Sequence, residues 1–239
     1  MTTIEARPGT MDADIISEMQ RGVYHVADYV RDGDWVVDVG AYIGAFAVHV
    51  KNHCPGARLL CIEPMPSNFP TLVQNAGDIA ITEQVALTGK AEPITLYDFG
   101  LDASACHSIY DLGVDGATAV EVTGMTLAQV LDKHGIDRVR FLKSDCQGAE
   151  FDIFPNTPSE VLSRVDYIAM EVHHAISKTG VQLGEIPEQR EKKRRLFTHL
   201  QKTHVPVHGD LQRGSVQVWC RRGLRKGPLG WLSRISDWF

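Results

Sequence analysis

The 239-residue sequence lacks the features of a membrane protein, a disulfide-linked protein or a nucleic-acid binder. No apolar run approaches the ~20 residues that a membrane span needs, and the N-terminus lacks the apolar core of a signal peptide. The 5 cysteines include no C-x-x-C pair, which argues against a disulfide framework or a zinc site. A net charge of −6 argues against the basic face of a sequence-independent nucleic-acid binder. We therefore expect a cytoplasmic protein with no membrane span and no nucleic-acid partner.

Two common nucleotide-binding motifs are also missing. The sequence has no G-x-x-x-x-G-K-[ST] loop, and its best glycine turn, "DVGAYIG" from Asp38 to Gly44, lacks the middle glycine of G-x-G-x-x-G. That glycine lets the backbone approach a pyrophosphate, so its absence argues against NAD. Asp38, at the end of a β-branched run, would repel a pyrophosphate and attract a cationic ligand. The turn therefore indicates a nucleotide-like ligand other than NAD or a nucleoside triphosphate.

What is present is an alternation of strand and helix patterns, which predicts an α/β fold with a mostly parallel sheet. Expected strands cover residues 35–39, 59–62, 79–87, 140–144 and 167–172. Expected helices cover residues 11–30, the segment after Gly44, a short helix or helical turn over 66–77, 127–135 with Thr126 as N-cap, and 188–203. A closing hairpin between about 205 and 220 implies one antiparallel strand near an edge. Ligands bind at the carboxyl ends of the strands in such sheets.

An acid also ends the second expected strand. Glu63 follows "CI" 25 residues after Asp38, and an acid at this position accepts hydrogen bonds from both hydroxyls of a ribose. The ligand predicted at this edge therefore carries a ribose.

Five segments together resemble one family of enzymes. "VVDVGAYIGAFAVHV", "CIEPMPSNFPTLVQN", "QVAL", "FLKSDCQGAEFDIF" and "AMEVHH" occur in the order and spacing of class I S-adenosylmethionine methyltransferases, and most resemble the FkbM family. The resemblance spans about residues 15–220. It implies a Rossmann-like fold: a seven-stranded, mostly parallel sheet with an antiparallel last strand and helices on both faces. It also implies O-methylation of a hydroxyl on a sugar or natural product (secondary metabolite), an activity of class EC 2.1.1.

The resemblance also divides the chain. Residues 1–33 would form an N-terminal helix that caps the cofactor pocket, and residues 34–222 the methyltransferase domain, with inserted strands and a loop near 91–124. Residues 223–239 form an amphipathic, aromatic tail for which a homodimer contact is one expectation.

The cofactor implied by the resemblance is S-adenosyl-L-methionine, with S-adenosyl-L-homocysteine as product. Asp38, Gly40 and Gly44 would lie along its methionine part, and Glu63 would bind the ribose. The remaining residues carried over from the family are Met65 beside the adenine, Ala86 at its edge, Asn68 near both, Tyr42 in the glycine turn and Asp145 after the fourth strand. Two departures from the family pattern stand out: Tyr42 replaces the usual Asn, and "DCQGAE" replaces an acid beside Asp145 with Gln147.

A hydroxyl is a poor nucleophile, so its methylation needs a base or a metal. Asp145 and Glu171 end adjacent expected strands, and His173 follows on the strand face of Glu171. We expect these three as the catalytic groups, with His173 as the preferred base because an imidazole titrates near neutral pH. The same three residues could instead hold a divalent metal such as Mg²⁺. The sequence leaves both readings open.

Three other functions stay open. They are a metal-assisted O- or N-methyltransferase acting on another small molecule, an NAD-type oxidoreductase, and a cofactor-binding protein without catalysis. The missing glycine argues against the second, and the set of Asp145, Glu171 and His173 argues against the third.

Overall fold

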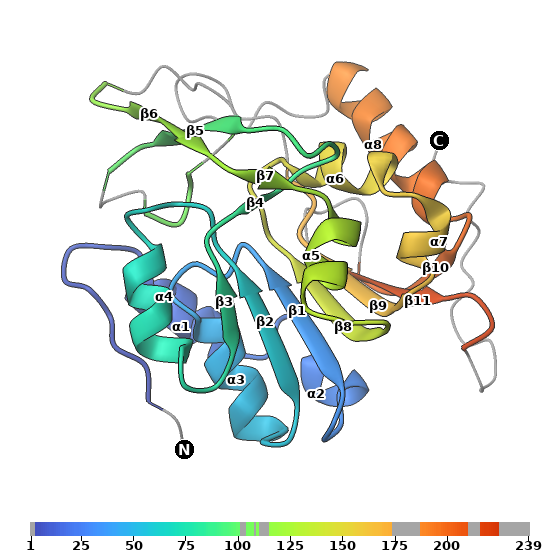
Figure 1. Cartoon of the computed structure of the whole chain (residues 1–239), viewed down its shortest axis with the longest axis horizontal. Helices are drawn as coiled ribbons and strands as arrows, with labels where there is room; N and C mark the ends of the chain where they lie inside the picture. Colours follow the sequence, from blue (N-terminus) through green and yellow to red (C-terminus); the bar gives the residue numbers. More distant parts are fainter. Residues whose placement is uncertain are drawn as a thin grey trace.

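The computed structural model describes residues 3–100, 104–107, 109, 115–173, 187–209 and 216–224. Within these residues, seven strands form one sheet in the order β10-β11-β9-β8-β1-β2-β3 (Figure 1). They are β1 (Trp35–Val39), β2 (Arg58–Ile62), β3 (Ile81–Glu83), β8 (Val139–Ser144), β9 (Val165–Met170), β10 (His204–His208) and β11 (Gln217–Arg221). β11 is antiparallel to β9 and to β10, and the other pairs are parallel. The expected sheet, including its antiparallel last strand, is confirmed.

Alternation along the strands explains the three layers. Val36 of β1 packs with the helices on one face, and its neighbours Val37 and Val39 pack with those on the other. The first face is covered by α1 (Asp12–Gln20), α2 (Val26–Tyr29), α3 (Ala45–His53) and α4 (Phe69–Ala76). The second is covered by α5 (Leu127–Lys133), α6 (Glu150–Asn156), α7 (Ser159–Leu162) and α8 (Pro187–Leu200). With both faces buried, the central strands are apolar almost throughout.

The N-terminal region differs from the single helix expected over residues 11–30. α1 ends at Gln20, and α2 begins only at Val26. Gly22 and His25 have positive φ angles, 71° and 56°, which a helix does not allow. The break turns the chain, so that Tyr24 points into the molecule with 3% exposure. The helical periodicity continued across this turn and hid it from the sequence pattern.

The strand expected over residues 79–87 is also divided. Only β3 joins the main sheet, and β4 (Ala86–Leu87) instead pairs in parallel with β7 (Gly124–Met125). β5 (Ile94–Asp98) and β6 (Thr118–Val122) form the expected added hairpin, which lies above the carboxyl ends of the main strands (Figure 1). In the described part of the chain, no helix is long and apolar enough to cross a membrane. The aromatic tail from residue 225 onward falls outside the described residues.

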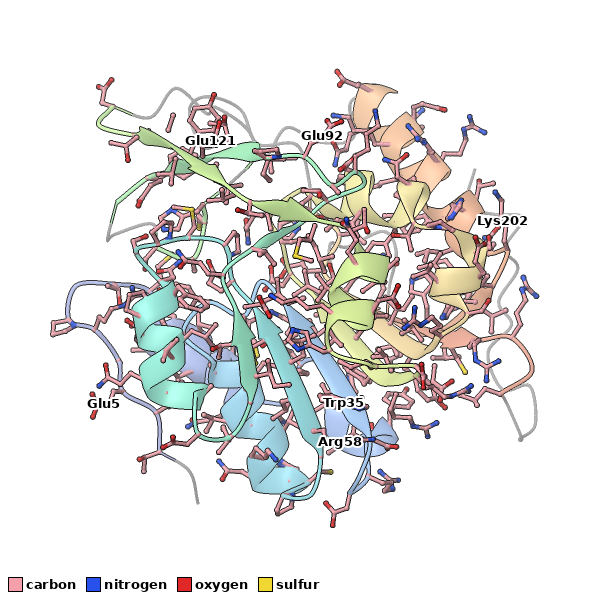
Figure 2. All side chains as sticks on the ribbon, in the orientation of Figure 1. Glu5, Trp35, Arg58, Glu92, Glu121 and Lys202 are labelled. Carbon is pink, nitrogen blue, oxygen red and sulfur yellow. The ribbon has the colours of Figure 1, made fainter. Side chains whose placement is uncertain are left out.

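The molecular surface carries the charged side chains that the composition predicts. Glu5, Glu92, Glu121 and Lys202 point away from the body of the protein at its periphery (Figure 2). Trp35 and Arg58 lie together at the opposite end of β1 and β2 from the glycine turn, with the guanidinium 4.7 Å from the ring centroid. This contact therefore lies at the amino ends of the two strands, away from the glycine turn.

Candidate active site

A cavity of about 270 Å³ lies at the carboxyl ends of the central strands. Its described lining includes Gly40 after β1, Glu63 after β2, Asp145 after β8 and Glu171 after β9. This is where the strand order reverses between β1 and β8, the switch point at which α/β sheets bind ligands. Residues of α1 and residues 104–107 and 109 also line the cavity.

Both glycines of the turn are needed for its shape. Gly40 has a φ of 73°, and a Cβ there would lie 1.9 Å from the carbonyl oxygen of Asp145. Gly44 has a φ of 87°, and a Cβ there would lie 3.1 Å from Leu72 of α4. Only glycine adopts these angles without strain. Gly40 lines the cavity, whereas Gly44 is not among its lining residues and instead lets α3 approach α4.

Glu63 is fixed at the cavity wall by the backbone. Its Oε2 accepts a hydrogen bond from the N–H of Tyr42 at 2.9 Å, and its Oε1 accepts one from the N–H of Met65 at 3.0 Å. Burial raises the pKa of this carboxyl to about 7. A carboxylate has about four lone-pair directions, so two remain for donors in the cavity. Glu63 therefore keeps acceptor capacity at the wall of the cavity.

Asp38 lies beneath the cavity and is not one of its lining residues. It is fully buried, and its Oδ1 lies 3.0 Å from the Nζ of Lys143. Lys143 also donates a hydrogen bond to the carbonyl of Gly40 at 2.7 Å. The buried ion pair therefore ties β8 to the glycine turn. Burial raises the pKa of Asp38 even beside this lysine.

Tyr42, which stands where the family pattern has Asn, contacts the N-terminal segment through its hydroxyl. Its φ is 53°, a left-handed value that Asn adopts more readily than Tyr. The ring lines the cavity, and the hydroxyl donates to the carboxylate of Asp12 and hydrogen-bonds with the hydroxyl of Ser104. Arg7 donates hydrogen bonds to both carboxylate oxygens of Asp12, and its guanidinium lies 5.3 Å from the Tyr42 ring centroid. We call Arg7, Asp12, Tyr42 and Ser104 the latch, because they join the N-terminal segment and the covering loop to the glycine turn.

Met65, Ala86 and Asn68 also line the cavity. They differ in whether their polar groups already have hydrogen-bond partners. Met65 packs in a small apolar cluster with Ala86 and Leu96, a suitable surface for a flat base. The N–H of Ala86 donates to the carbonyl of Thr123, so this donor is already used. Asn68 extends the latch, because its amide donates to the carbonyl of Ser104 and its oxygen accepts from Arg7.

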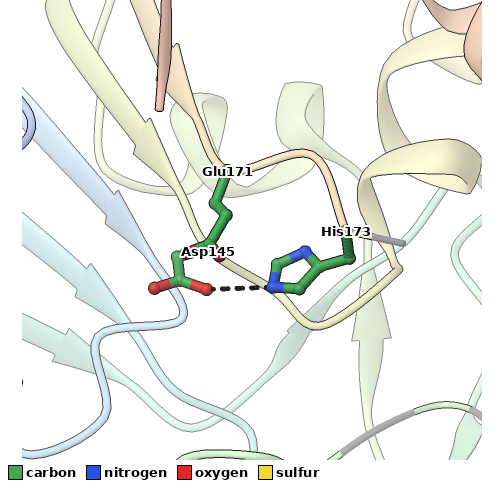
Figure 3. Close-up of side chains that lie close together, drawn as sticks. All are labelled: Asp145, Glu171 and His173. Carbon is green, nitrogen blue, oxygen red and sulfur yellow. Dashed lines mark ion pairs between the residues drawn. The ribbon is translucent and has the colours of Figure 1, made fainter. Parts of the chain in front are cut away.

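The three predicted catalytic residues come together. Ligand-type atoms of Asp145, Glu171 and His173 all lie within 4.8 Å of one another. Figure 3 shows the imidazole directed at Asp145, with 3.4 Å between Nε2 and Oδ1, and Glu171 adjacent. Asp145 and Glu171 line the cavity, whereas His173 lies behind them. β9 ends at Met170, so Glu171 and His173 meet in the turn after the strand and not on a strand face.

Two further residues of this site were not assigned a role from the sequence. Glu150, at the start of α6, accepts hydrogen bonds from the N–H of His173 at 2.8 Å and from its Nδ1 at 3.1 Å. Tyr24 donates its hydroxyl to Oδ2 of Asp145 at 3.0 Å. No local pattern marks either contact, because the partners lie 23 and 121 residues apart.

The electrostatics of the cluster follow from its burial and its carboxylates. Burial alone would lower the pKa of His173, but Glu150 and Asp145 raise it well above the usual value. Burial alone would raise the pKa of Asp145, but Lys143 and His173 lower it. Burial and the neighbouring Asp145 charge raise the pKa of Glu171 to about 7. The two carboxylates thus favour the protonated form of His173, which argues against the role of free base predicted for it.

The sheet topology and the position of the cavity indicate the general class of protein. A mostly parallel sheet with an antiparallel last strand, a glycine turn after β1 and an acid after β2 define a Rossmann-like fold, a class that commonly binds nucleotide cofactors. A family model, the methyltransferase FkbM domain, matches residues 38–196, which is more than half of the chain. The chain belongs to the FkbM methyltransferase family and is thus an S-adenosylmethionine-dependent methyltransferase. The prediction made from the ordered motifs is confirmed.

Individual relatives agree with this assignment. The chain is 28% identical over 181 residues to the 31-O-demethyl-FK506 methyltransferase FkbM of Streptomyces tacrolimicus, covering 63% of this chain and 70% of that one. It is 25% identical over 181 residues to the methyltransferase sdnD of Sordaria araneosa, covering 62% and 69%. Among solved structures, fibrillarin of Aeropyrum pernix with bound S-adenosyl-L-methionine is similar at 13% identity and a TM-score of 0.42, covering 84% and 73%. That last likeness is too distant to carry an argument.

Proposed function

We propose that this methyltransferase transfers a methyl group to a hydroxyl oxygen of a sugar or natural-product acceptor. The observation that carries the proposal is the division of the cavity. On one side of β1, Glu63 presents a carboxylate suited to a ribose, and on the other side Asp145 and Glu171 present carboxylates beside His173. Glu63 would hold the cofactor at the first side, next to the carboxylates of the second side where the acceptor would bind.

The residues present fit S-adenosyl-L-methionine. Gly40 lines the cavity and lets the turn approach the backbone of Asp145, Glu63 keeps lone pairs for further donors, and the cluster of Met65, Ala86 and Leu96 offers an apolar surface for the adenine. Bound there, this cofactor supplies an electrophilic methyl carbon on a sulfonium. Asp38 and Lys143 contribute from below by holding the glycine turn against β8.

The acceptor would meet the cluster after β8 and β9. Asp145 and Glu171 line the cavity and can orient a hydroxyl by accepting its hydrogen bond, which is mainly a positioning effect. Glu171, whose pKa is raised to about 7, is the member of the cluster best suited to take up the hydroxyl proton. An N–H acceptor would need this help less, because an amine is already a good nucleophile. The name of the Streptomyces relative, an O-demethyl-FK506 methyltransferase, supports oxygen as the acceptor atom.

Isotope-labelled transfer tests the acceptor atom. A pool of hydroxylated and aminated glycosides and polyketides, incubated with S-adenosyl-L-methionine carrying a deuterated methyl, should yield products with one labelled methyl on oxygen. Glu171→Gln should reduce the initial rate by about 100-fold or more, in the range expected for a group that assists proton transfer. Glu121→Gln, an exposed acid on β6, is the matched control and should leave the rate unchanged. Labelled methyl found only on nitrogen would contradict the proposal.

A further inference from the structure

The cluster after β8 and β9 has the construction of a metal site. Asp145, Glu171 and His173 each offer one ligand atom, and these atoms lie within 4.8 Å of one another. Neighbouring ligands on an octahedral ion, with bonds of about 2.1 to 2.3 Å, lie about 3.0 to 3.3 Å apart. The 3.4 Å between Nε2 of His173 and Oδ1 of Asp145 is close to this spacing. Two carboxylates and an imidazole are a usual donor set for divalent ions.

The orientation of His173 is a second, independent observation. Glu150 is fully buried, and its Oε1 accepts hydrogen bonds from both the backbone N–H and Nδ1 of His173. Nδ1 therefore carries a proton, and Nε2 points at Asp145 and Glu171 (Figure 3). Among the described residues, this buried Nε2 has no hydrogen-bond partner. A carboxylate that holds one imidazole nitrogen while the other faces oxygen ligands is the usual outer arrangement of a metal-binding histidine.

Asp145 is oriented in the same way. Tyr24 donates to Oδ2 at 3.0 Å, which leaves Oδ1 directed at His173, with the amide of Gln147 at a longer 3.4 Å. Both ligand side chains are thus held from behind by a group outside the cluster. A surface acid that happens to lie near a histidine has no such support.

The charge balance also calls for a cation. Four carboxylates gather here: Asp38, Asp145, Glu150 and Glu171. Lys143 lies 3.0 Å from Asp38 and also acts on Asp145. His173 contacts Asp145 and Glu150, so only two basic side chains of the described residues lie among the four acids. Carboxylates this close repel one another, and burial weakens the screening of that repulsion by water. A divalent ion between Asp145 and Glu171 would offset it.

We propose that Asp145, Glu171 and His173 bind one divalent metal ion and that Glu150 positions His173 for this role. The open coordination positions of the ion would face the cavity where the acceptor hydroxyl binds. Asp145 and Glu171 line that cavity, so a hydroxyl oxygen can complete the coordination sphere. Coordination would orient the acceptor and favour loss of its proton. The effect on the acceptor rests on the proposed function, whereas metal binding itself does not.

Direct binding of Mn²⁺ to the full-length chain tests this proposal. After removal of metals with a chelator, calorimetry and the electron paramagnetic resonance of free Mn²⁺ should show one saturable site. Glu150→Gln should weaken Mn²⁺ binding about 10- to 100-fold, as expected for loss of an outer partner. His173→Gln removes a ligand and should weaken binding at least as much. Glu121→Gln is the surface control and should bind Mn²⁺ as the wild type does.

The same proteins are titrated with S-adenosyl-L-homocysteine, which also verifies that each variant is folded. If the wild type binds this product but no Mn²⁺, or if both site variants bind Mn²⁺ as tightly as the wild type, the metal site is wrong and the methyltransferase proposal stands. If the wild type binds neither, the proposed function fails as well. If Glu150→Gln alone fails to fold, His173→Gln decides the outcome.

Discussion

The carboxylate of Glu63 both holds the local backbone in place and lines the cavity. It ties together Tyr42 and Met65 through their backbone N–H groups, and it still faces the cavity. Its burial raises the pKa of the carboxyl to about 7, so that its charge changes near neutral pH. A ribose diol donates hydrogen bonds, and the ionised carboxylate accepts them better than the protonated acid. Cofactor affinity should therefore depend on the state of this one residue.

The first prediction concerns that dependence. Since the folded protein without cofactor holds a proton on Glu63 below about pH 7, binding must displace it there. Affinity for S-adenosyl-L-homocysteine should weaken about tenfold per pH unit below 7 and level off above about 8. Calorimetry from pH 5.5 to 8.5 measures this slope. Glu63→Gln should bind more weakly with a flatter profile, and an equal slope in that variant would assign the pH dependence to another group.

At the scale of residues, the sequence predicts position best where a residue directly follows a strand. Asp145, Glu171 and Glu63 follow strand ends, so their meeting at one sheet edge could be predicted from the strand pattern. Glu150 and Tyr24 could not be, because their contacts depend on how α6 and the α1–α2 turn pack against that edge. For Asp38, the sequence indicated a position near the ligand, and the structure places it one layer lower, against Lys143.

At the scale of elements, the latch connects segments that the sheet alone would leave independent. Asp12 at the start of α1 is fully buried. A buried carboxylate is costly unless hydrogen bonds or an opposite charge offset the loss of water. Burial alone would raise its pKa, but hydrogen bonds from Arg7 and Tyr42 lower it. The N-terminal segment and the loop at Ser104 are therefore held over the cavity through the hydroxyl of Tyr42.

Tyr42→Phe tests the latch. The change removes the hydroxyl bonded to Asp12 and Ser104 and keeps the ring, so the free energy of unfolding should fall by about 1.5 to 3 kcal/mol. Hydrogen exchange of residues 3–12 should also become faster. Urea unfolding and exchange mass spectrometry measure the two effects. Tyr97→Phe on the β5–β6 hairpin is the control, and equal, small effects in both variants would show that the latch contributes little.

Element boundaries show what periodicity can and cannot predict. Thr126 forms the expected N-cap of α5, with a full capping box completed by Gln129, because both partners are local in sequence. The break at Gly22–His25 and the separation of β4 from β3 were missed. Both depend on distant partners: Tyr24 bonds to Asp145, and β4 pairs with β7.

At the scale of the whole molecule, the sheet order sets the arrangement of the site. β2, β1, β8 and β9 lie side by side, so that the residues after them, from Glu63 through Gly40 to Asp145 and Glu171, line a single cavity. Strand alternation predicted the parallel sheet, and the family resemblance supplied the seven strands and the antiparallel last one. The covering layer could not be predicted in detail, because it is built from the latch and from two short added sheets.

The central claim is that this cavity binds an S-adenosyl cofactor through Glu63 and the turn at Gly40. Its most direct test is calorimetric titration of the full-length chain with S-adenosyl-L-homocysteine, with NADH as the matched nucleotide control. The account predicts one site for S-adenosyl-L-homocysteine with micromolar or tighter affinity, and no binding of NADH. Saturable binding of NADH without binding of S-adenosyl-L-homocysteine would contradict it.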